Sequence, residues 1–312
     1  MNQTRFAWVT TLLLLVALFS CDPDSKETVD PQNDYSGLRA GAMSGACRTF
    51  QYADTIFYPR EQATDYVVVP VTAQAGTYGA YPGGMIINAA TGAINVTKSD
   101  HGLKYRVWFV KAGTSDTCNR YVTLSGVNYV SKLYNISSTD TLAKPFYNAI
   151  RNLAPPCSDG GADDDEEDDD DDGCEFDDGD DDDDGDGSGD EPPTGQQVTL
   201  LGVDINKQVG IINLRRTVTN GTFGATPVNG TSKAIRIYYR LNDASNRTLN
   251  YIDVTLHYYT SASHVPAWLR AQVDQKWGAT LRRAASTTPP ILNGPVMDVQ
   301  RPRPPDIVIV GY

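Results

Sequence analysis

The sequence predicts a mainly β protein: an antiparallel sandwich, then a disordered Asp-rich insertion, then a second β region with one amphipathic helix. Segments rich in Val, Tyr, Phe, Ile and Thr recur between Gly, Pro, Asn and Asp, as strands do between turns. No helical segments alternate regularly with them, which disfavours a parallel α/β sheet. Residues 163–191 hold 21 of the 39 acidic residues and no Lys or Arg, and without them the net charge of −13 becomes +8. The acidity is therefore local, and residues 195–312 carry 13 basic and 6 acidic residues.

The chain begins "MNQTRFAWVTTLLLLVALFSC", in which Arg5 precedes an apolar run that ends at Phe19. This pattern predicts an export signal over residues 1–20. "LFSC" resembles the lipobox of bacterial lipoproteins, and the resemblance implies acylation of Cys21. Two or more acyl chains would hold the protein in a membrane. Asp54-Thr55-Ile56 and Asp140-Thr141-Leu142 resemble the O-glycosylation motif of exported proteins of Bacteroidota. We expect an exported, Bacteroidota-type surface lipoprotein anchored to the outer membrane; the alternative is an ordinary secretory signal.

Residues 21–40, which follow the signal, are polar and contain Pro, and we expect a flexible tether. Residues 41–156 form the first predicted β domain. Within it, "YPGGMIINAATGAIN" alternates Met85 and Ile87 on a short strand, turns at Gly92 and returns through Ile94. The segment resembles the P-x-G-L-x-I-n-x-x-T-G-x-I signature of bacterial Ig and cadherin-like modules, which implies an Ig/cadherin-like sandwich. The calcium-binding motifs of cadherins are missing from it. The next strand should place Tyr105, Val107 and Phe109 on one face.

Four cysteines remain after Cys21, and in an exported protein they are expected to pair. Three connectivities exist. We favour Cys47 with Cys118 inside the first domain, and Cys157 with Cys174 across the first acidic block.

The second β region is predicted over residues 196–312. "KAIRIYYRLND" and "LNYIDVTLHYYT" should pair as a hairpin. A helix is expected over residues 266–285, because Leu269, Val273, Trp277 and Leu281 are spaced by four. "PDIVIVGY" suggests a terminal edge strand, and residues 140–154 suggest a short helix near Pro145.

The Asp-rich segment, residues 157–195, has competing interpretations. Asp180, Asp182, Asp184 and Glu191 fit an EF-hand loop, but such a match is nearly guaranteed in a run of Asp, and the prolines after Glu191 forbid the exiting helix. A second interpretation is that the Asp-rich run associates weakly with Ca²⁺ without forming an EF-hand. The run is otherwise an extended spacer, or it neutralises the basic C-terminal region in cis. If it is a spacer, deletion of residues 163–191 should leave the melting temperature in EDTA nearly unchanged.

A candidate ligand face lies on the predicted hairpin, where basic and aromatic side chains share one side of the two strands. Its members are Arg236, Tyr238, Arg240, Tyr251, His257 and Tyr259. We expect no cofactor and no enzymatic activity, because the three histidines have no partners at metal-ligand or triad spacing and no catalytic motif occurs. The expected role is structural or adhesive, with a surface protein as partner. The alternative is a glycan-binding accessory lipoprotein; nucleic acid is excluded as a partner because the polyanion would compete for any basic groove.

Overall fold

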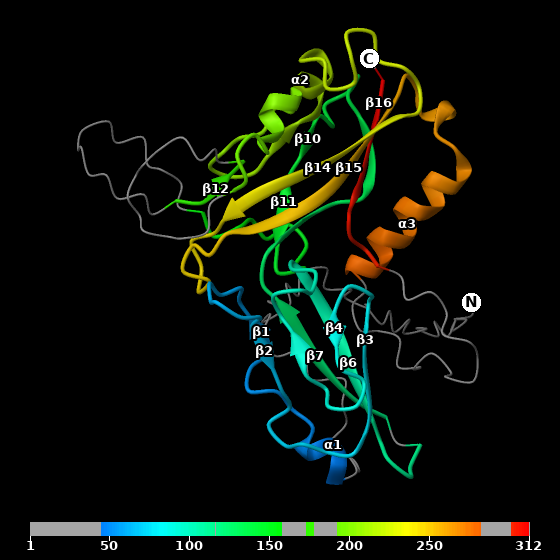
Figure 1. Cartoon of the computed structure of the whole chain (residues 1–312). Helices are drawn as coiled ribbons and strands as arrows, with labels where there is room; N and C mark the ends of the chain where they lie inside the picture. The colour runs from blue at the N-terminus through cyan, green and yellow to red at the C-terminus, as the bar shows by residue number, and fades with distance from the viewer. Residues whose placement is uncertain (1–44, 116, 158–172, 178–191, 282–300, 312) are drawn as a thin grey trace, which may run out of the picture. The chain divides into compact units, whose positions relative to one another are not determined.

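The computed structural model describes residues 45–115, 117–157, 173–177, 192–281 and 301–311 (Figure 1). The fold is mainly β, as the sequence predicts. The predicted signal, Cys21 and the tether lie outside the described residues.

Two sheets enclose the first hydrophobic core. One has the strand order β1-β7-β6-β3 and the other β2-β5-β4. Side chains from both sheets, among them Phe57, Ile94 and Val107, belong to one buried cluster, which makes this part a β sandwich. A short helix, α1, precedes it. The elements are α1 (Gly45–Thr49), β1 (Ile56–Phe57), β2 (Val67–Val68), β3 (Gly76–Tyr81), β4 (Ile86–Ile87), β5 (Ile94–Asn95), β6 (Leu103–Lys111) and β7 (Thr117–Leu124).

The motif that resembles Ig and cadherin-like modules forms the expected hairpin. Strands β4 and β5 pair antiparallel, with Ile87 opposite Ile94. Gly92 has a φ of +72° and its N–H donates to the carbonyl of Asn88 at 2.8 Å. A side chain at this turn would need positive φ and would also strike the Tyr78 ring, so glycine is required. On β6, Tyr105, Val107 and Phe109 are all buried, as predicted.

A five-stranded sheet with the order β12-β14-β15-β16-β9 forms the centre of the second part. The predicted hairpin is confirmed, since β14 pairs antiparallel with β15 and Tyr238 lies opposite Tyr251. Two small two-stranded sheets, β11-β8 and β10-β13, accompany it. The elements are β8 (Val127–Tyr129), β9 (Lys132–Asn135), β10 (Leu142–Ala143), β11 (Pro145–Tyr147), β12 (Glu175–Phe176), η1 (Val198–Leu201), β13 (Ile212–Asn213), α2 (Leu214–Thr219), β14 (Thr231–Arg240), β15 (Asn250–Tyr259), η2 (Ala262–His264), α3 (Ala267–Leu281) and β16 (Asp306–Val310).

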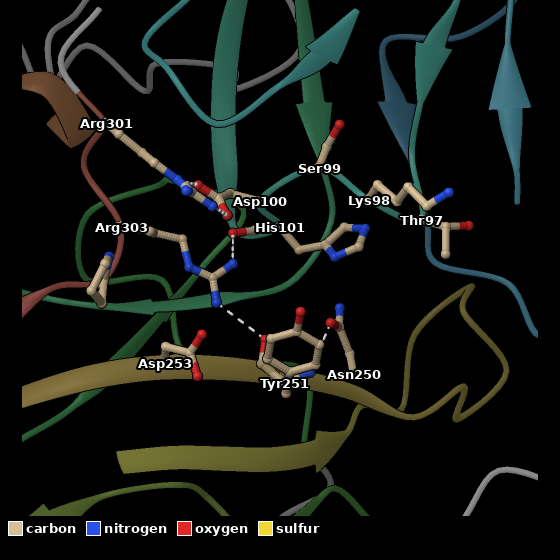
Figure 2. Close-up of a pocket in the computed structure, with 11 residues that line it drawn as sticks. Thr97, Lys98, Ser99, Asp100, His101, Asn250, Tyr251, Asp253, Arg301 and Arg303 are labelled. Carbon is tan, nitrogen blue, oxygen red and sulfur yellow. Dashed lines mark hydrogen bonds and ion pairs between the residues drawn. The ribbon is translucent and has the colours of Figure 1, made fainter. Parts of the chain in front are cut away.

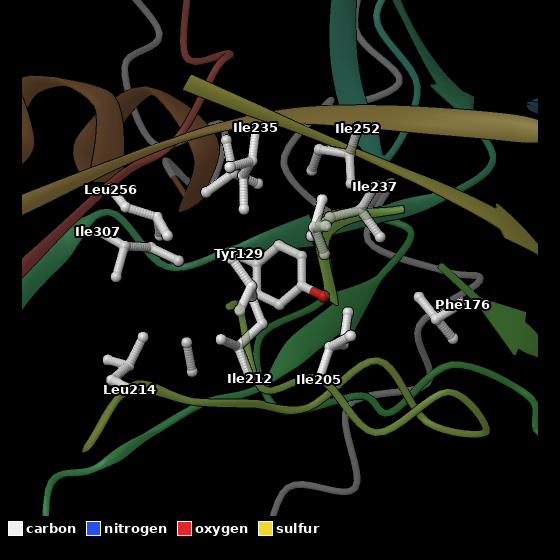
Figure 3. Close-up of a cluster of buried hydrophobic side chains, with 14 of the residues drawn as sticks. Tyr129, Phe176, Ile205, Ile212, Leu214, Ile235, Ile237, Ile252, Leu256 and Ile307 are labelled. Atoms are coloured by element: carbon white, nitrogen blue, oxygen red, sulfur yellow. The ribbon is translucent and has the colours of Figure 1, made fainter. Parts of the chain in front are cut away.

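Both faces of the five-stranded sheet are covered near its C-terminal strand. On β16, Ile307 and Ile309 face a large core that also holds Leu214 of α2 (Figure 3). Val308 and Val310 pack in a separate cluster with helix α3. The prediction of a terminal edge strand is therefore wrong: β16 lies between β15 and β9 and pairs with each in parallel. An uninterrupted apolar run is typical of a strand buried on both faces.

Helix α3 confirms the predicted amphipathic helix over the residues that the structure describes. Leu269 and Val273 are buried against the sheet. Trp277 is half-buried and meets the edge of the Phe146 ring at 6.4 Å between centroids.

The Asp-rich segment is not one uniform spacer. Within it, β12 pairs with β14, and Phe176 is fully buried and stacks on Tyr239 with 5.7 Å between centroids. The Asp177 carboxylate accepts hydrogen bonds from the backbone N–H groups of Val198 and Thr199 at 2.5 and 3.0 Å. The prediction that residues 157–195 form a disordered insertion is thus wrong for 173–177, because Phe176 supplies apolar surface to bury. Both flanking acidic runs lie outside the described residues.

The predicted domain boundary at residue 156 does not match the packing. The first core ends at Leu124, and Val127 and Tyr129 already belong to the second. Strand β9 lies in the same sheet as β16 because the two strands pair in parallel over Lys132–Asn135. The described residues between 45 and 311 belong to one compact unit.

The predicted helix over residues 140–154 is absent. Phe146 and Tyr147 instead pair with β8, antiparallel to Asn128 and Val127. Asn148, Ala149 and Asn152 follow with φ between 52° and 62°, a left-handed conformation that a right-handed helix excludes. Pairing with a distant strand overrides the local helical spacing.

Two disulfides join the pairs favoured from the sequence, Cys47–Cys118 and Cys157–Cys174, with Cα–Cα distances of 5.1 and 4.9 Å. The first lies in the sandwich core, and the second fixes the start of β12 to the chain that follows β11. Across the described ranges, no helix has the length and apolar character needed to cross a membrane.

Candidate functional site

A polar cleft of ≈180 Å³ is lined by residues from three separate stretches of the chain (Figure 2). The stretches are residues 97–101 between β5 and β6, residues 250–253 at the start of β15, and residues 301–304 just before β16. Its lining carries three basic side chains, Lys98, Arg301 and Arg303, and two carboxylates, Asp100 and Asp253.

Arg303 is the buried cation of the cleft, with a relative exposure of 7%. Its Nη1 donates to the carbonyl of His101 at 2.6 Å and its Nη2 to that of Tyr251 at 3.1 Å. Within the described ranges no carboxylate forms an ion pair with it. The cleft carboxylates are already paired, Asp100 with Arg301 at 2.7 Å and Asp253 with Arg236 at 2.7 Å. The charge of Arg303 is thus not neutralised inside the cleft.

His101 and Asn250 lie behind these charges, and both are more than nine-tenths buried. His101 Nε2 and Asn250 Nδ2 have no hydrogen-bond partner among the described residues. Burial, reinforced by the Arg303 charge, lowers the pKa of His101 to about 4, so its ring is neutral at pH 7. An unpaired buried polar atom costs about 1–3 kcal/mol, so this part of the cleft is incomplete without a further polar group.

Tyr251 lies at the rim of the cleft and is 44% exposed. The Arg236 guanidinium covers one side of its ring at 3.9 Å from the centroid, and the Tyr238 ring lies 6.0 Å away. These three residues are the part of the predicted ligand face that stays accessible.

The rest of that predicted face is buried. Arg240 pairs with Glu175 of β12 at 3.5 Å, while Tyr259 packs in the cluster under α3. His257 is also buried and bonds Asp306. The six residues do share one side of the hairpin, but β12 and α3 cover two ends of it. Glu175, which lies within the Asp-rich segment, also pairs with Arg247. The acidic runs on either side of it lie outside the described residues, so neutralisation of the basic C-terminal region by the run stays a prediction.

Ser232, His257 and Asp306 form a hydrogen-bonded series of the kind found in catalytic triads, although no histidine has a partner at triad spacing in the sequence. Ser232 Oγ lies 2.7 Å from His257 Nδ1, and His257 Nε2 lies 3.0 Å from Asp306 Oδ1. Asp306 also receives Lys276 Nζ at 2.6 Å and Gln272 Nε2 at 2.7 Å, both from α3. The Asp306 carboxylate is thus shared among His257, Lys276 and Gln272. Ser232, His257 and Asp306 do not line the cleft. We infer that this hydrogen-bonded group fastens α3 onto the sheet.

No local sequence pattern signals the cleft directly. Arg301 and Arg303 stand two apart in "RPRPP", a pattern typical of an extended segment that points both side chains to one side. His101 lies in "SDHG", a sequence typical of a turn, and its contact with Arg303 spans 202 residues. Such a contact follows from the fold and not from local spacing.

The predicted calcium ligands Asp180, Asp182, Asp184 and Glu191 lie outside the described residues, as does Cys21. Among the residues that are described, no group of three or more His, Cys, Asp or Glu side chains is arranged to hold a metal ion.

No protein-family model matches the chain, and no curated protein matches it. Among solved structures, human protocadherin-24 EC1-2 aligns with 67% of this chain and 96% of its own, at 10% identity and a TM-score of 0.17. Human CDH23 EC21-23 aligns with 66% of this chain and 63% of its own, at 14% identity and a TM-score of 0.17. At such TM-scores neither likeness supports an argument about fold or function.

Proposed function

We propose that the protein is a non-enzymatic, lipid-anchored surface protein with an adhesive role, and that it binds a glycan at the cleft beside Tyr251. The observation that carries this proposal is the half-exposed Tyr251 ring at the rim of a polar cleft. Sugars bind proteins by stacking a ring face on an aromatic side chain while their hydroxyls meet polar groups, a division that suits amphipathic aromatic residues. The lipobox-like "LFSC" supports a place on the membrane.

The size of the cleft supports recognition of a single sugar unit. Its ≈180 Å³ is below the roughly 300–1,000 Å³ of sites that enclose drug-sized ligands. One unit of a longer glycan would enter while the remainder stays in solvent, which is the arrangement that an adhesive contact needs.

A glycan array tests the proposal with the wild-type protein and Tyr251→Ala. We expect binding to a defined subset of glycans and its loss in the variant. Tyr66→Ala is the matched control, since Arg60 covers that ring at 4.6 Å and Tyr66 does not line the cleft. Equal loss in both variants, or retained binding in Tyr251→Ala, would refute the site.

A second candidate is adhesion through another surface protein, and exposed apolar side chains on β2, just after β2 and on β4 favour it. Val67, Val69, Val71 and Ile86 are 47%, 60%, 57% and 51% exposed. If this patch mediates adhesion, Val69→Lys should abolish cell attachment while Tyr251→Ala leaves it intact.

A further inference from the structure

We infer that the cleft is specific for an acidic sugar, one with a carboxylate in addition to its hydroxyls. This inference rests on the proposed glycan-binding function and specifies the class of ligand. It follows from the charge inventory of the cleft, from the way Arg303 is held, and from the two unpaired nitrogens beside it.

The cleft has one positive charge more than it neutralises. Asp100 is engaged by Arg301 in a two-pronged pair, Nε to Oδ2 at 2.7 Å and Nη2 to Oδ1 at 2.8 Å. Asp253 is engaged in the same way by Arg236. The third basic side chain of the lining, Lys98, pairs with Asp65, which lies outside the lining, at 2.5 Å. Arg303 is therefore the remaining cation, and a ligand carboxylate is its natural complement.

Arg303 is also prepared for such a ligand. Its two carbonyl contacts fix the guanidinium plane before any ligand arrives, so little side-chain entropy is lost on binding. Because it is 7% exposed, a charge pair formed there is less screened than one on the open surface.

The unpaired nitrogens indicate a sugar acid in preference to a simple carboxylate. The His101 ring is neutral at pH 7, so one of its two nitrogens is a hydrogen-bond acceptor, and Nε2 is the nitrogen recorded without a partner among the described residues. Asn250 Nδ2 is a donor. A hydroxyl can donate to His101 Nε2 and accept from Asn250 Nδ2, so one sugar hydroxyl would satisfy both nitrogens. Both atoms are covered in the free protein, so a hydroxyl reaches them only if neighbouring side chains move.

Isothermal titration calorimetry tests the inference with an oligomer of galacturonic acid and the same oligomer as its methyl ester. The two probes have the same hydroxyls and ring, and differ in charge. We expect the acid to bind at least tenfold more tightly than the ester, and we expect added salt to reduce this preference. Free acetate should not displace the oligomer at matched concentration; displacement would mean that any carboxylate suffices and would overturn the inference.

Two variants locate the charge. Arg303→Gln should remove the preference for the acid, but its burial puts folding at risk. Arg301→Gln is the safer second variant, because Arg301 is 62% exposed and its loss frees Asp100 to repel the ligand. Arg216→Gln is the control, since Arg216 is also exposed and paired with an aspartate outside the cleft. We expect Arg301→Gln to bind the acid at least tenfold more weakly than the wild-type protein does, and Arg216→Gln to bind it as the wild-type protein does.

The outcomes separate the inference from the function on which it rests. Equal binding of acid and ester, lost in Tyr251→Ala, would overturn acid specificity and leave the glycan-binding function standing. Failure of every glycan to bind would refute both. Acid preference that survives both arginine variants would place the charge recognition outside this cleft and overturn the inference.

Discussion

Acidification should destabilise the protein through His101. Its pKa is lowered from 6.5 to about 4, first by burial and then by the Arg303 charge. The neighbouring charges that face it are Arg303, which donates to its carbonyl, and Asp100, which is paired with Arg301. Between the two pKa values the unfolded chain holds a proton on this ring that the folded protein does not. The free energy of unfolding therefore falls as the pH falls from 6.5 to about 4.

The magnitude follows from the same two values. At about 1.4 kcal/mol per pKa unit, the difference between 6.5 and about 4 corresponds to about 3 kcal/mol. Urea unfolding followed by Trp fluorescence, at several values between about pH 7 and about pH 4, measures the loss. Carboxylates also titrate in this range, so the informative quantity is the difference between the wild-type protein and His101→Gln.

We expect the wild-type protein to lose about 3 kcal/mol more stability than His101→Gln over this range. His264→Gln is the control for the substitution itself, because His264 is exposed. Parallel pH profiles for the wild-type protein and His101→Gln would show that the ring is charged in the folded protein, and would refute the reasoning.

Three further predictions concern stability, each measured by urea unfolding. Phe176→Ala should cost about 3–5 kcal/mol, because the ring is fully buried against Tyr239; a cost below about 1 kcal/mol would mean that β12 does not dock. Asp306→Asn should cost about 3 kcal/mol, since it leaves Lys276 without its buried partner; an unchanged midpoint would show that α3 is held by apolar contacts alone. Replacing Cys47 and Cys118 together with Ser should cost about 4 kcal/mol in the chain-entropy model for their separation of 71 residues, whereas equal stability under reducing and oxidising conditions would contradict the bridge.

Features encoded within short windows were predictable from the sequence. The β14–β15 hairpin follows from alternating apolar residues on both sides of a polar turn, and the pairing register bears this out. Helix α3 follows from the spacing of Leu269 and Val273. The Gly92 turn follows from the need for positive φ.

Features that depend on distant pairing were not predictable in this way. Strand β9 joins β16 although Leu133 and Val308 lie far apart in the chain, and nothing near either residue signals the other. Strand β12 is two residues long and aspartates surround it, so the composition of the segment predicts disorder. Its one aromatic side chain, Phe176, is nevertheless buried in the core. The earlier expectation for deletion of residues 163–191 changes accordingly. Removing Phe176 with the acidic runs should lower the melting temperature, whereas removing residues 178–191 alone spares it.

The position of the Cys157–Cys174 bridge also determines what a protease would release. Cleavage anywhere in residues 158–172 leaves the two pieces covalently joined, so a denaturing gel shows separate fragments only after reduction. No disulfide spans residues 178–191, since the two bridges join Cys47 to Cys118 and Cys157 to Cys174. Cleavage there separates the fragments on a denaturing gel without reductant, and in the native protein the β12–β14 pairing and the buried contacts of Phe176 and Asp177 help to keep them together.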